Sequence, residues 1–576
     1  MKIRYIAIVL GLAAMTLTSC KDFLDKAPDS RVDLVTPADV KGLLLGAYTP
    51  YNYAIVGEFS SDNVIDLNAP REGALRFSLS PYDEVDREIF NFEDVKTGTG
   101  SDSPSEVWEG CFRAIAYCNA ALERIAEIEG GAYNMTDEEA VQLSASKGEA
   151  LVSRAYHYFI LAQVFCMPYR GPELSKGLQG LPYVTTPETT VMPQYNREDL
   201  ATVYEKIEKD LTAGLPLIND ATYEAPKYHF NKNAANAFAA RFYLFTRQYD
   251  KSLKYANDAL ASGELLSMMP DIWAQQDFYY ISDINRYYVS VDRPGNFMLF
   301  GTYSTAWRRF LGYRYAPNGD GRRATIQGPG PTWNGCRYIN NTTQETFAMH
   351  PCFFSVCGSA GDQRYGSYFA GTCGEQFEYT DKLAGIGYCH MVRTEFTAEE
   401  TLLCRAEAKL FLGDIDGAFA DLNVWDQGRR NYAASDDRMV EFTKDRLISF
   451  YQTTDPGYGI VKDIHVDEVC PSDKYQVTAA ILPYLQCVQH FRRISLVHTG
   501  MRWFDIKRLG LSITHRIATT SDGQYKDEVL QTLDPRYAIQ IPDEVIAAGF
   551  EPNDRVAPTV SGSDAVINTS ISAYYK

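Results

Sequence analysis

Two distant stretches of the sequence share one spacing of small and large apolar residues around a short turn. The first is AARFYLFTRQYDKSLKYANDAL, residues 239–260, and the second is ETLLCRAEAKLFLGDIDGAFADLNVW, residues 400–425. Small residues allow two antiparallel helices to approach closely, and the larger apolar residues fill the seam between them. A single pair cannot bury its own apolar face, so such pairs stack. The sequence therefore predicts stacked helix pairs of the tetratricopeptide type.

The apolar residues between positions 105 and 262 recur at steps of three and four, which is the period of an amphipathic helix. This spacing predicts helices over residues 105–125, 137–165, 197–215, 231–246 and 251–261. The fold class that follows is mainly α. We expect an α-α superhelix of tetratricopeptide-like helix pairs, with a loop-rich insert that contains short strands.

Residues 271–396 form the insert that interrupts this helical pattern. The segment is rich in Gly, Pro, Tyr and Asn and has no sustained period, which predicts loops and short strands. Insertions into repeat scaffolds usually form a binding face. The predicted parts of the chain are a signal peptide (1–19), a tether and loop segment (20–104), a helical block (105–270), the insert as ligand face (271–396) and a C-terminal helical block (397–576).

The chain begins with an export signal. Lys2 and Arg4 precede twelve mostly apolar residues. Twelve helical residues cover only ~18 Å, short of the ~30 Å hydrocarbon core of a bilayer. The signal ends in LTSC, which resembles the bacterial lipobox and predicts that Cys20 carries acyl chains that anchor the protein in a lipid bilayer. The alternative is a secretory signal with a chance cysteine at its cleavage site. No later stretch is apolar for eighteen residues.

The composition excludes one class of partner and favours another. Loss of residues 1–19 removes two positive charges and changes the formal net charge from −19 to −21, which disfavours nucleic acid. Aromatic residues make up 13% of the chain, with 39 tyrosines. Tyrosine and tryptophan offer a flat apolar face with a polar edge, which suits ligand platforms, although tyrosine-rich cores are also common.

The cysteines and acidic residues give no clear metal or catalytic site. With Cys20 acylated, eleven cysteines remain, an odd number without a CxxC pair. Four of them lie near two histidines, but their spacings match no known zinc motif, and one local disulfide is the alternative: Cys352, Cys357, Cys373 and Cys389, with His350 and His390. Asp414 and Asp416 weakly resemble a calcium loop, but they fall on the predicted repeat turn. We expect no metal and no cofactor.

The catalytic motifs that sequence can reveal are missing. The chain contains no GxSxG, HExxH or GxxxxGK[ST]. A pair of carboxylates for glycoside hydrolysis cannot be judged from sequence among 74 acidic residues. Sugar binding needs aromatic faces beside hydroxyl-binding polar groups, and the insert supplies both. The candidate ligand-binding residues there are Tyr303, Trp307, Arg308, Tyr313, Tyr315, Trp333 and Asn334.

Five separated segments together resemble the SusD-like (RagB/SusD) family of outer-membrane lipoproteins, and the resemblance runs over most of the chain. They are the lipid cysteine followed by KDFLD, the helix with Trp108, the RAYHYF segment 154–159, GMRWFDIKRLG at 500–510 and YAIQIPDE at 537–544, which resembles the closing strand and turn of the family. The chain departs from the family pattern at Cys166, Phe491, Thr499 and Gln540. We interpret the GMRWFDIKRLG run as structural.

The resemblance implies a function. Members of the family bind nutrients, mostly glycans, without cleaving them, and pass them to a TonB-dependent (SusC-like) transporter. It implies further that Asp62 and Asn63, which lie in the region of a family binding loop, contact the ligand. The expected protein is therefore a non-enzymatic glycan-binding lipoprotein of the outer membrane that faces the exterior. Two alternatives remain: the same role with peptide or glycopeptide cargo, and a surface glycoside hydrolase.

Overall fold

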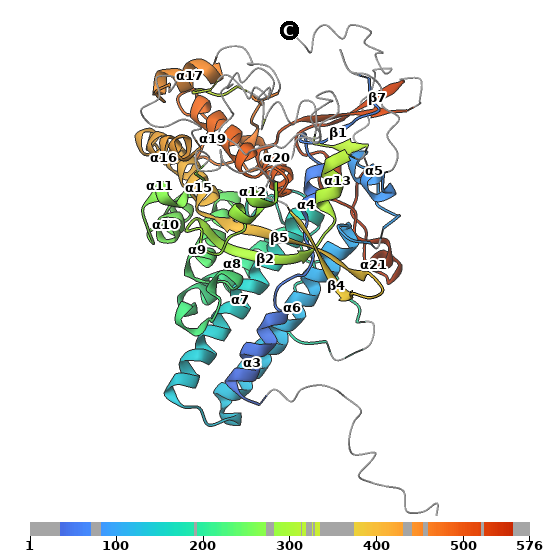
Figure 1. Cartoon of the computed structure of the whole chain (residues 1–576), viewed down its shortest axis with the longest axis vertical. Coiled ribbons are helices and arrows are strands. Elements are labelled where there is room, and N and C mark those ends of the chain that lie inside the picture. Colours follow the sequence, from blue (N-terminus) through green and yellow to red (C-terminus); the bar gives the residue numbers. More distant parts are fainter. Residues whose placement is uncertain are drawn as a thin grey trace, which may run out of the picture.

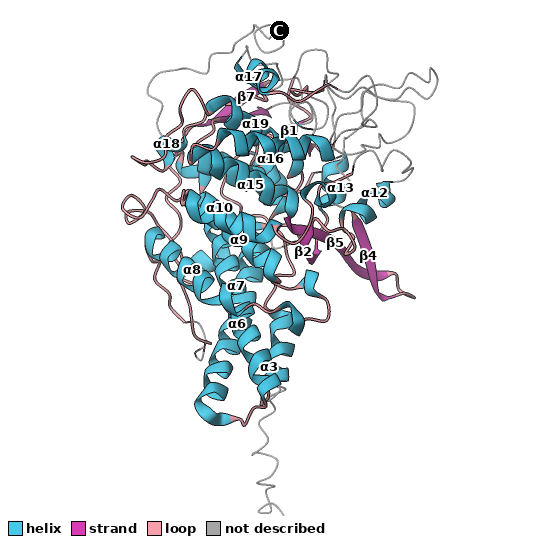
Figure 2. Ribbon diagram, turned by 90° about the vertical axis from the view of Figure 1, so that its left-hand side faces the viewer, coloured by secondary structure: helices cyan, strands magenta, loops and turns pink. Residues whose placement is uncertain are grey.

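The computed structural model describes residues 35–70, 82–98, 100–188, 190, 193–271, 281–312, 314–317, 325, 329–333, 374–429, 440–452, 459–519 and 524–556. Cys20, Tyr313, Asn334 and the cysteines at 352, 357 and 373 lie outside these residues. The described chain is mainly helical, as predicted, with its few strands gathered beside the helices (Figures 1 and 2). No helix in the described ranges is long and apolar enough to cross a membrane.

Two long antiparallel helices form the axis of the molecule. Helix α6 (Pro104–Glu127) begins with proline after the capping side chain of Ser103. Helix α7 (Asp137–Phe165) begins with a capping box between Thr136 and Glu139. Both starts match the sequence prediction because proline at the first helical position and a Ser/Thr cap satisfy free backbone amides. The C-terminal half of α7 is buried on almost every side.

The predicted helix pairs stack as expected. Helices α9 (Lys232–Phe245) and α10 (Tyr249–Leu260) form the first pair, and α15 (Ala398–Phe411) and α16 (Ile415–Gly428) form the second. Helix α10 packs directly against α15 although more than one hundred residues separate them (Figure 2). Small buried residues line this stack, which confirms the prediction of a tetratricopeptide-like scaffold: Ala239, Ala240, Ala256, Ala259, Ala406 and Ala408.

The remaining helices surround these pairs. They are α3 (Pro37–Leu43), α4 (Ala54–Phe59), α5 (Glu84–Phe90), α8 (Leu200–Gly214), α11 (Leu265–Met268), α12 (Ile281–Tyr288), α13 (Ala306–Gly312), α17 (Lys444–Gln452), α18 (Val466–Val469), α19 (Leu482–Ser495), α20 (Met501–Leu509) and α21 (Asp543–Ala547). Helices α3, α4 and α5 lie within residues 35–70 and 82–98, in the segment predicted as a tether and loop. Helix α4 is fully buried there, and a Cβ on its Gly57 would lie only 2.2 Å from the Gly500 carbonyl oxygen.

The insert contributes a three-stranded antiparallel sheet rather than only short strands. Its order is β2 (Asn296–Tyr303), β5 (Ile386–Thr397) and β4 (Glu375–Asp381). Two smaller antiparallel pairs are β1 (Ile65–Asp66) with β3 (Tyr315–Ala316), and β6 (Ile513–Ala518) with β7 (Tyr525–Leu530). The sheet was hard to predict because β2 and β5 are separated in sequence by more than eighty residues.

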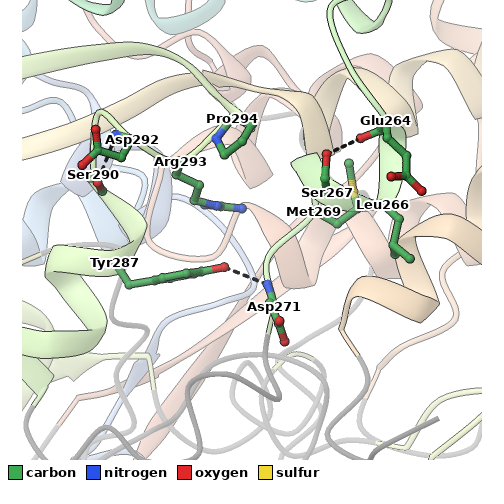
Figure 3. A pocket seen from close by; sticks show the side chains of 10 residues that line it. All are labelled: Glu264, Leu266, Ser267, Met269, Asp271, Tyr287, Ser290, Asp292, Arg293 and Pro294. Carbon is green, nitrogen blue, oxygen red and sulfur yellow. Dashed lines mark hydrogen bonds between the residues drawn. The ribbon is translucent and has the colours of Figure 1, made fainter.

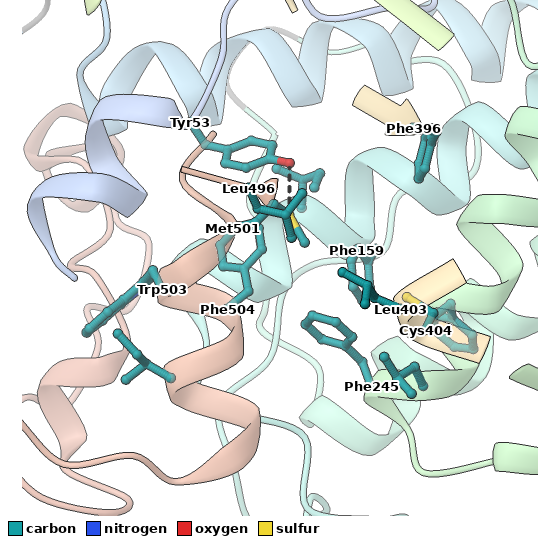
Figure 4. Close-up of a cluster of buried hydrophobic side chains, with 14 of the residues drawn as sticks. Tyr53, Phe159, Phe245, Phe396, Leu403, Cys404, Leu496, Met501, Trp503 and Phe504 are labelled. Atoms are coloured by element: carbon teal, nitrogen blue, oxygen red, sulfur yellow. Dashed lines mark hydrogen bonds between the residues drawn. The ribbon is translucent and has the colours of Figure 1, made fainter. Parts of the chain in front are cut away.

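The run GMRWFDIKRLG forms α20, and all nine helical residues are buried. Gly500 and Gly510 flank the helix with positive φ, as residues without a side chain do readily. Figure 4 shows Phe504 of α20 beside Tyr53 from the N-terminal segment, with Phe159 of α7 in the same core. The buried charges are paired: Asp505 accepts hydrogen bonds from Arg492 at 3.0 Å and from Arg508 at 2.7 Å. The run is structural, as interpreted from sequence.

The predicted closing strand at YAIQIPDE is wrong. Residues 538–542 pair with no strand in the described part of the chain, and helix α21 starts at Asp543. The segment instead lies across the end of α7, where the Ile539 amide donates to the Val164 carbonyl oxygen at 3.1 Å. Gln540, where the family pattern has proline, accepts from the backbone amide of Asn553 at 2.8 Å. Isolated hydrogen bonds to α7 and to Asn553 thus take the place of a sheet ladder.

Candidate functional site

Three aromatic side chains gather on one face of the β2–β5–β4 sheet. Tyr303 lies opposite His390, and Tyr388 lies opposite Glu378. Directly paired residues of an antiparallel sheet project to the same side, and so do residues two apart on one strand. Tyr303, Tyr388 and His390 therefore share a face. The centroid of the Tyr303 ring lies 4.6 Å from that of His390 and 5.6 Å from that of Tyr388.

The N-terminal segment extends this surface. The backbone amide of Tyr303 donates to the Pro50 carbonyl oxygen at 2.7 Å, which holds the next residue, Tyr51, beside the end of β2. The rings of Tyr51 and Tyr303 are 6.2 Å apart, and the Arg113 guanidinium lies 5.5 Å from the Tyr51 centroid. We call Tyr51, Tyr303, Tyr388 and His390 the tyrosine face.

Polar groups border the tyrosine face. His390 Nε2 lies 2.7 Å from Glu378 Oε2, and Tyr388 is 57% exposed. Partial burial, with the carboxylates of Glu106 and Glu109 nearby, raises the pKa of Tyr51, so its hydroxyl stays protonated at neutral pH. Exposed rings beside a guanidinium, an imidazole and carboxylates can stack on the C–H face of a sugar and hydrogen-bond its hydroxyls.

The opposite face of the sheet also carries aromatic side chains, but these have different polar neighbours. Phe377 and Tyr379 are 43% and 53% exposed and contact each other edge to face, with centroids 4.8 Å apart. Arg308, one of the predicted site residues, lies over this side, where its Nε donates to Glu375 Oε2 at 3.0 Å and its Nη2 lies 3.2 Å from Cys389 Sγ. Trp307, next to it in α13, is partly buried against the core.

Helix α13, which carries Trp307 and Arg308, is fixed by buried carboxylates. Asp102 accepts a hydrogen bond from Ser304 Oγ at 2.6 Å and another from the Thr305 amide at 2.8 Å. Arg309 pairs with Asp86 in the interior. Burial raises the pKa of Asp102 to about 6, against the effect of these donors. The position of Trp307 and Arg308 is thus set by the protein before any ligand arrives.

Two predicted site residues lie in the interior instead. Tyr315 is fully buried in β3, with its ring 4.8 Å from that of Phe90. Trp333 is 9% exposed and packs among Trp425, His490 and Phe491, which belong to α16 and α19. Sequence could not separate these rings from Tyr303 because all three lie in the same loop-rich composition.

The side chains of Asp62 and Asn63 also form contacts with other residues of the protein. The Asp62 carboxylate accepts from Arg502 Nε at 2.8 Å and lies 3.4 Å from both Arg493 and Lys462. These cations hold its pKa well below the ordinary value although burial opposes them. Asn63 is 1% exposed, and its amide joins Arg493 to Glu58. The pair connects the N-terminal segment to α19 and α20 rather than facing solvent.

The structure adds residues that the sequence analysis missed: Tyr51, Tyr388, His390, Phe377 and Tyr379. A signal for four of them existed in QFEYTD and GYCH, where polar and aromatic residues alternate with the period of a strand on both sides of the Gly385 turn. Tyr51 carried no such signal, because its role depends on a contact with a strand more than two hundred residues away.

A separate pocket of about 560 Å³ lies between α11 and the loop after α12. Its walls include Glu264, Asp271, Tyr287, Asp292 and Arg293 (Figure 3). The backbone amide of Asp271 donates a 2.8 Å hydrogen bond to the Tyr287 hydroxyl oxygen. The pocket is large enough for one or two sugar rings, but its tyrosine is already engaged.

The other candidate chemistries are absent from the described residues. No cluster of three or more metal-ligating side chains occurs in the part of the chain that the structure covers. The seven described cysteines, Cys389 among them, are free thiols. Asp414, considered above for calcium, caps α16 by accepting from the Gly417 amide at 2.8 Å. The zinc and disulfide alternatives rest mainly on residues outside the described ranges.

Comparison with known proteins gave a family match for the N-terminal part of the chain. Residues 22–244 match the model of the family SusD-like, described as "Starch-binding associating with outer membrane". No curated protein matches the sequence. The similarity to this family model covers the N-terminal helices and ends within α9.

Solved structures extend the similarity to nearly the whole chain. A SusD superfamily protein from Bacteroides thetaiotaomicron has 18% identity and a TM-score of 0.53, covering 90% of this chain and all of its own. A SusD-like protein from Bacteroides fragilis has 16% identity and a TM-score of 0.54, covering 92% and 98%. A SusD-like carbohydrate binding protein from Bacteroides vulgatus has 16% identity and a TM-score of 0.51, covering 89% and 96%. At these identities the similarity shows the fold. The family-model match adds that residues 22–244 are similar in sequence to the SusD-like family.

Proposed function

We propose that this protein is a surface lipoprotein that binds an oligosaccharide or polysaccharide and passes it to a TonB-dependent outer-membrane transporter without cleaving it. The observation that carries the proposal is the tyrosine face: three tyrosines and a histidine, partly exposed, beside Arg113 and Glu378. The similarity of residues 22–244 to a family described as starch-binding and associated with the outer membrane supports both the ligand class and the place.

The sheet suits ligand binding because its aromatic side chains are already held in place before the ligand binds. The rings of Tyr51, Tyr303 and Tyr388 come from segments joined by backbone hydrogen bonds, so little conformational freedom is lost on binding. Trp307 and Arg308, on the other side of the sheet, provide a second place where a long glycan chain gains contacts. In this proposal Tyr303, Trp307 and Arg308 remain ligand-binding residues, and Tyr51, Tyr388 and His390 join them.

The experiment is calorimetric titration of the purified protein with a panel of plant, host and microbial glycans, with analysis of reducing ends in the same samples. Binding to one glycan class without new reducing ends is the expected result. Tyr388→Ala should weaken this binding, and Tyr228→Ala is the control, because Tyr228 is also an exposed tyrosine, at 44%, but lies in a short helical turn outside the sheet. New reducing ends would show a hydrolase and contradict the proposal.

The anchor and the partner need their own tests. Acylation at Cys20 predicts a lipid-modified N-terminal peptide by mass spectrometry, lost in Cys20→Ala together with membrane association. Delivery predicts that the protein copurifies with a large β-barrel transporter from solubilised outer membranes. A protein that fractionates as a free periplasmic species would contradict this part of the proposal while leaving glycan binding intact.

One observation favours the peptide alternative. Strand β4 has a neighbour on one side only in the described part of the chain, and such an edge can pair with an extended peptide. A panel of peptides in the same titrations distinguishes this cargo: peptide binding together with silence across the glycans would favour it.

A further inference from the structure

A small cavity in the interior is lined by an unusual number of cations. Its volume is about 20 Å³, and its walls include four arginines and three glutamates: Arg241, Arg293, Arg393, Arg429, Glu395, Glu399 and Glu400. Each of these seven residues is less than 9% exposed. The cavity lies where β5 and α15 meet the turn between α19 and α20.

Three of the four arginines pair with these glutamates. Arg241 pairs with Glu395 and Glu400, Arg393 pairs with Glu395, and Arg429 pairs with Glu399. Nearby guanidinium groups lower the pKa of Glu395, which keeps it ionised.

Arg293 is the cation without a carboxylate. It forms no ion pair with the described residues, although it is 8% exposed. Its Nη1 makes one long hydrogen bond of 3.4 Å to Asn296 Oδ1, and its guanidinium lies 5.4 and 5.3 Å from the rings of Tyr287 and Tyr288. Aromatic faces stabilise the charge but do not satisfy the N–H donors.

Several donors at the cavity have no acceptor in the described part of the chain. They are Nε and Nη2 of Arg293 and Nη1 of Arg393, all buried. A buried donor without a partner is costly, and more so on a charged group. A water molecule fits 20 Å³ and could accept some of these hydrogen bonds, but it would leave the positive charge uncompensated.

We propose that the cavity binds a monovalent halide ion, chloride under ordinary conditions, held by Arg293 and Arg393. A halide accepts hydrogen bonds from any direction and supplies the missing negative charge. Arg293 also lines the larger pocket of Figure 3. The site lies apart from the tyrosine face and does not depend on the proposed glycan function.

The direct test is anomalous diffraction from crystals of the purified protein grown with sodium bromide in place of chloride. We expect an anomalous peak in the cavity within hydrogen-bond distance of the Arg293 and Arg393 side chains. An ordinary water there, with no anomalous signal, would overturn the proposal. This test needs no variant and therefore does not depend on whether a substitution folds.

The second test measures thermal unfolding at constant ionic strength while gluconate is exchanged for chloride. A bound halide should raise Tm by roughly 1–2 °C once chloride exceeds its Kd tenfold, as ligand linkage requires. Arg293→Gln should abolish this dependence, whereas Arg286→Gln, which removes an exposed cation from the neighbouring helix, should keep it. Equal Tm values in chloride and gluconate for the unmodified protein would contradict halide binding.

Discussion

Helix α20 and the β4–β5 hairpin are built from similar ingredients and have opposite surroundings. Both mix aromatic residues with charged ones, as MRWFDIKRL and as EQFEYTD with IGYCHMVR. In α20 all nine residues are buried and the charges find partners on other helices. In the hairpin, Phe377, Tyr379 and Tyr388 are 43%, 53% and 57% exposed. The comparison shows that residue type alone does not distinguish a buried scaffold helix from an exposed sheet surface. The contacts that the charged side chains make do distinguish them.

The strongest test of this contrast removes a buried charge from the scaffold. Asp505→Ala leaves Arg492 and Arg508 buried without this carboxylate, and we expect a loss of ~3–5 kcal/mol in the free energy of unfolding. Chemical denaturation measures it. Asp527→Ala, in the exposed pair with Arg516, is the control and should cost less than ~1 kcal/mol. Similar losses in the two variants would remove the distinction.

The hairpin should respond in the opposite way. Tyr388→Ala should lower glycan affinity about tenfold, or ~1.4 kcal/mol, because one stacking ring is lost, while the free energy of unfolding changes little. Titration and denaturation of the same sample give both numbers. If Tyr379→Ala weakens binding as much as Tyr388→Ala, the ligand uses both faces of the sheet, and the tyrosine face as defined would be too narrow.

The pH dependence of stability tests one buried charged residue of α20, Lys507. Burial lowers the pKa of Lys507 from 10.5 to about 7, so between these values the unfolded chain binds a proton that the folded chain does not. The Lys507 contribution to stability therefore increases as pH rises from about 7 to about 10, by up to ~1.4 kcal/mol per pH unit. Unfolding free energies of Lys507→Met and the unmodified protein across this range should show a smaller slope for the variant. Equal slopes would contradict a lowered pKa.

The smallest effect is expected at a helix end that belongs to neither region. Asp414→Ala removes the cap of α16 and should cost ~1 kcal/mol, seen as a small fall in Tm. Calcium and chelators should leave the Tm of the unmodified protein unchanged, since Asp414 acts as a cap. A rise in Tm with calcium that Asp414→Ala abolishes would restore the calcium interpretation.

The helical scaffold could be predicted because its signals are local. Pro104, the capping box at Thr136 and the small residues of the helix pairs each act within a few residues or within one pair of helices. The predicted helix 137–165 agrees with α7 at both ends. The RAYHYF and GMRWFDIKRLG segments were also interpreted correctly as parts of one scaffold, since both lie in buried helices.

The ligand face could be predicted only in part because it depends on distant contacts. Tyr303, Tyr315 and Trp333 have the same local composition, but only Tyr303 ends a strand at the surface, while the others pack against Phe90 and Trp425. Asp62 had the expected chemistry for a hydroxyl ligand and instead compensates Arg502 and Arg493. Which polar group faces solvent is settled by segments that meet only after folding.

The close contact between Gly57 of α4 and Gly500 has a consequence for how the protein is made. Residues 54–66 pack against residues 493–518, so the two ends of the described chain complete one core together. Contacts of such high sequence separation form late and slow folding. During synthesis, residues 54–66 emerge long before residues 493–518 and cannot complete this core until those residues follow. We therefore expect the N-terminal half to depend on holding chaperones until the C-terminal helices arrive.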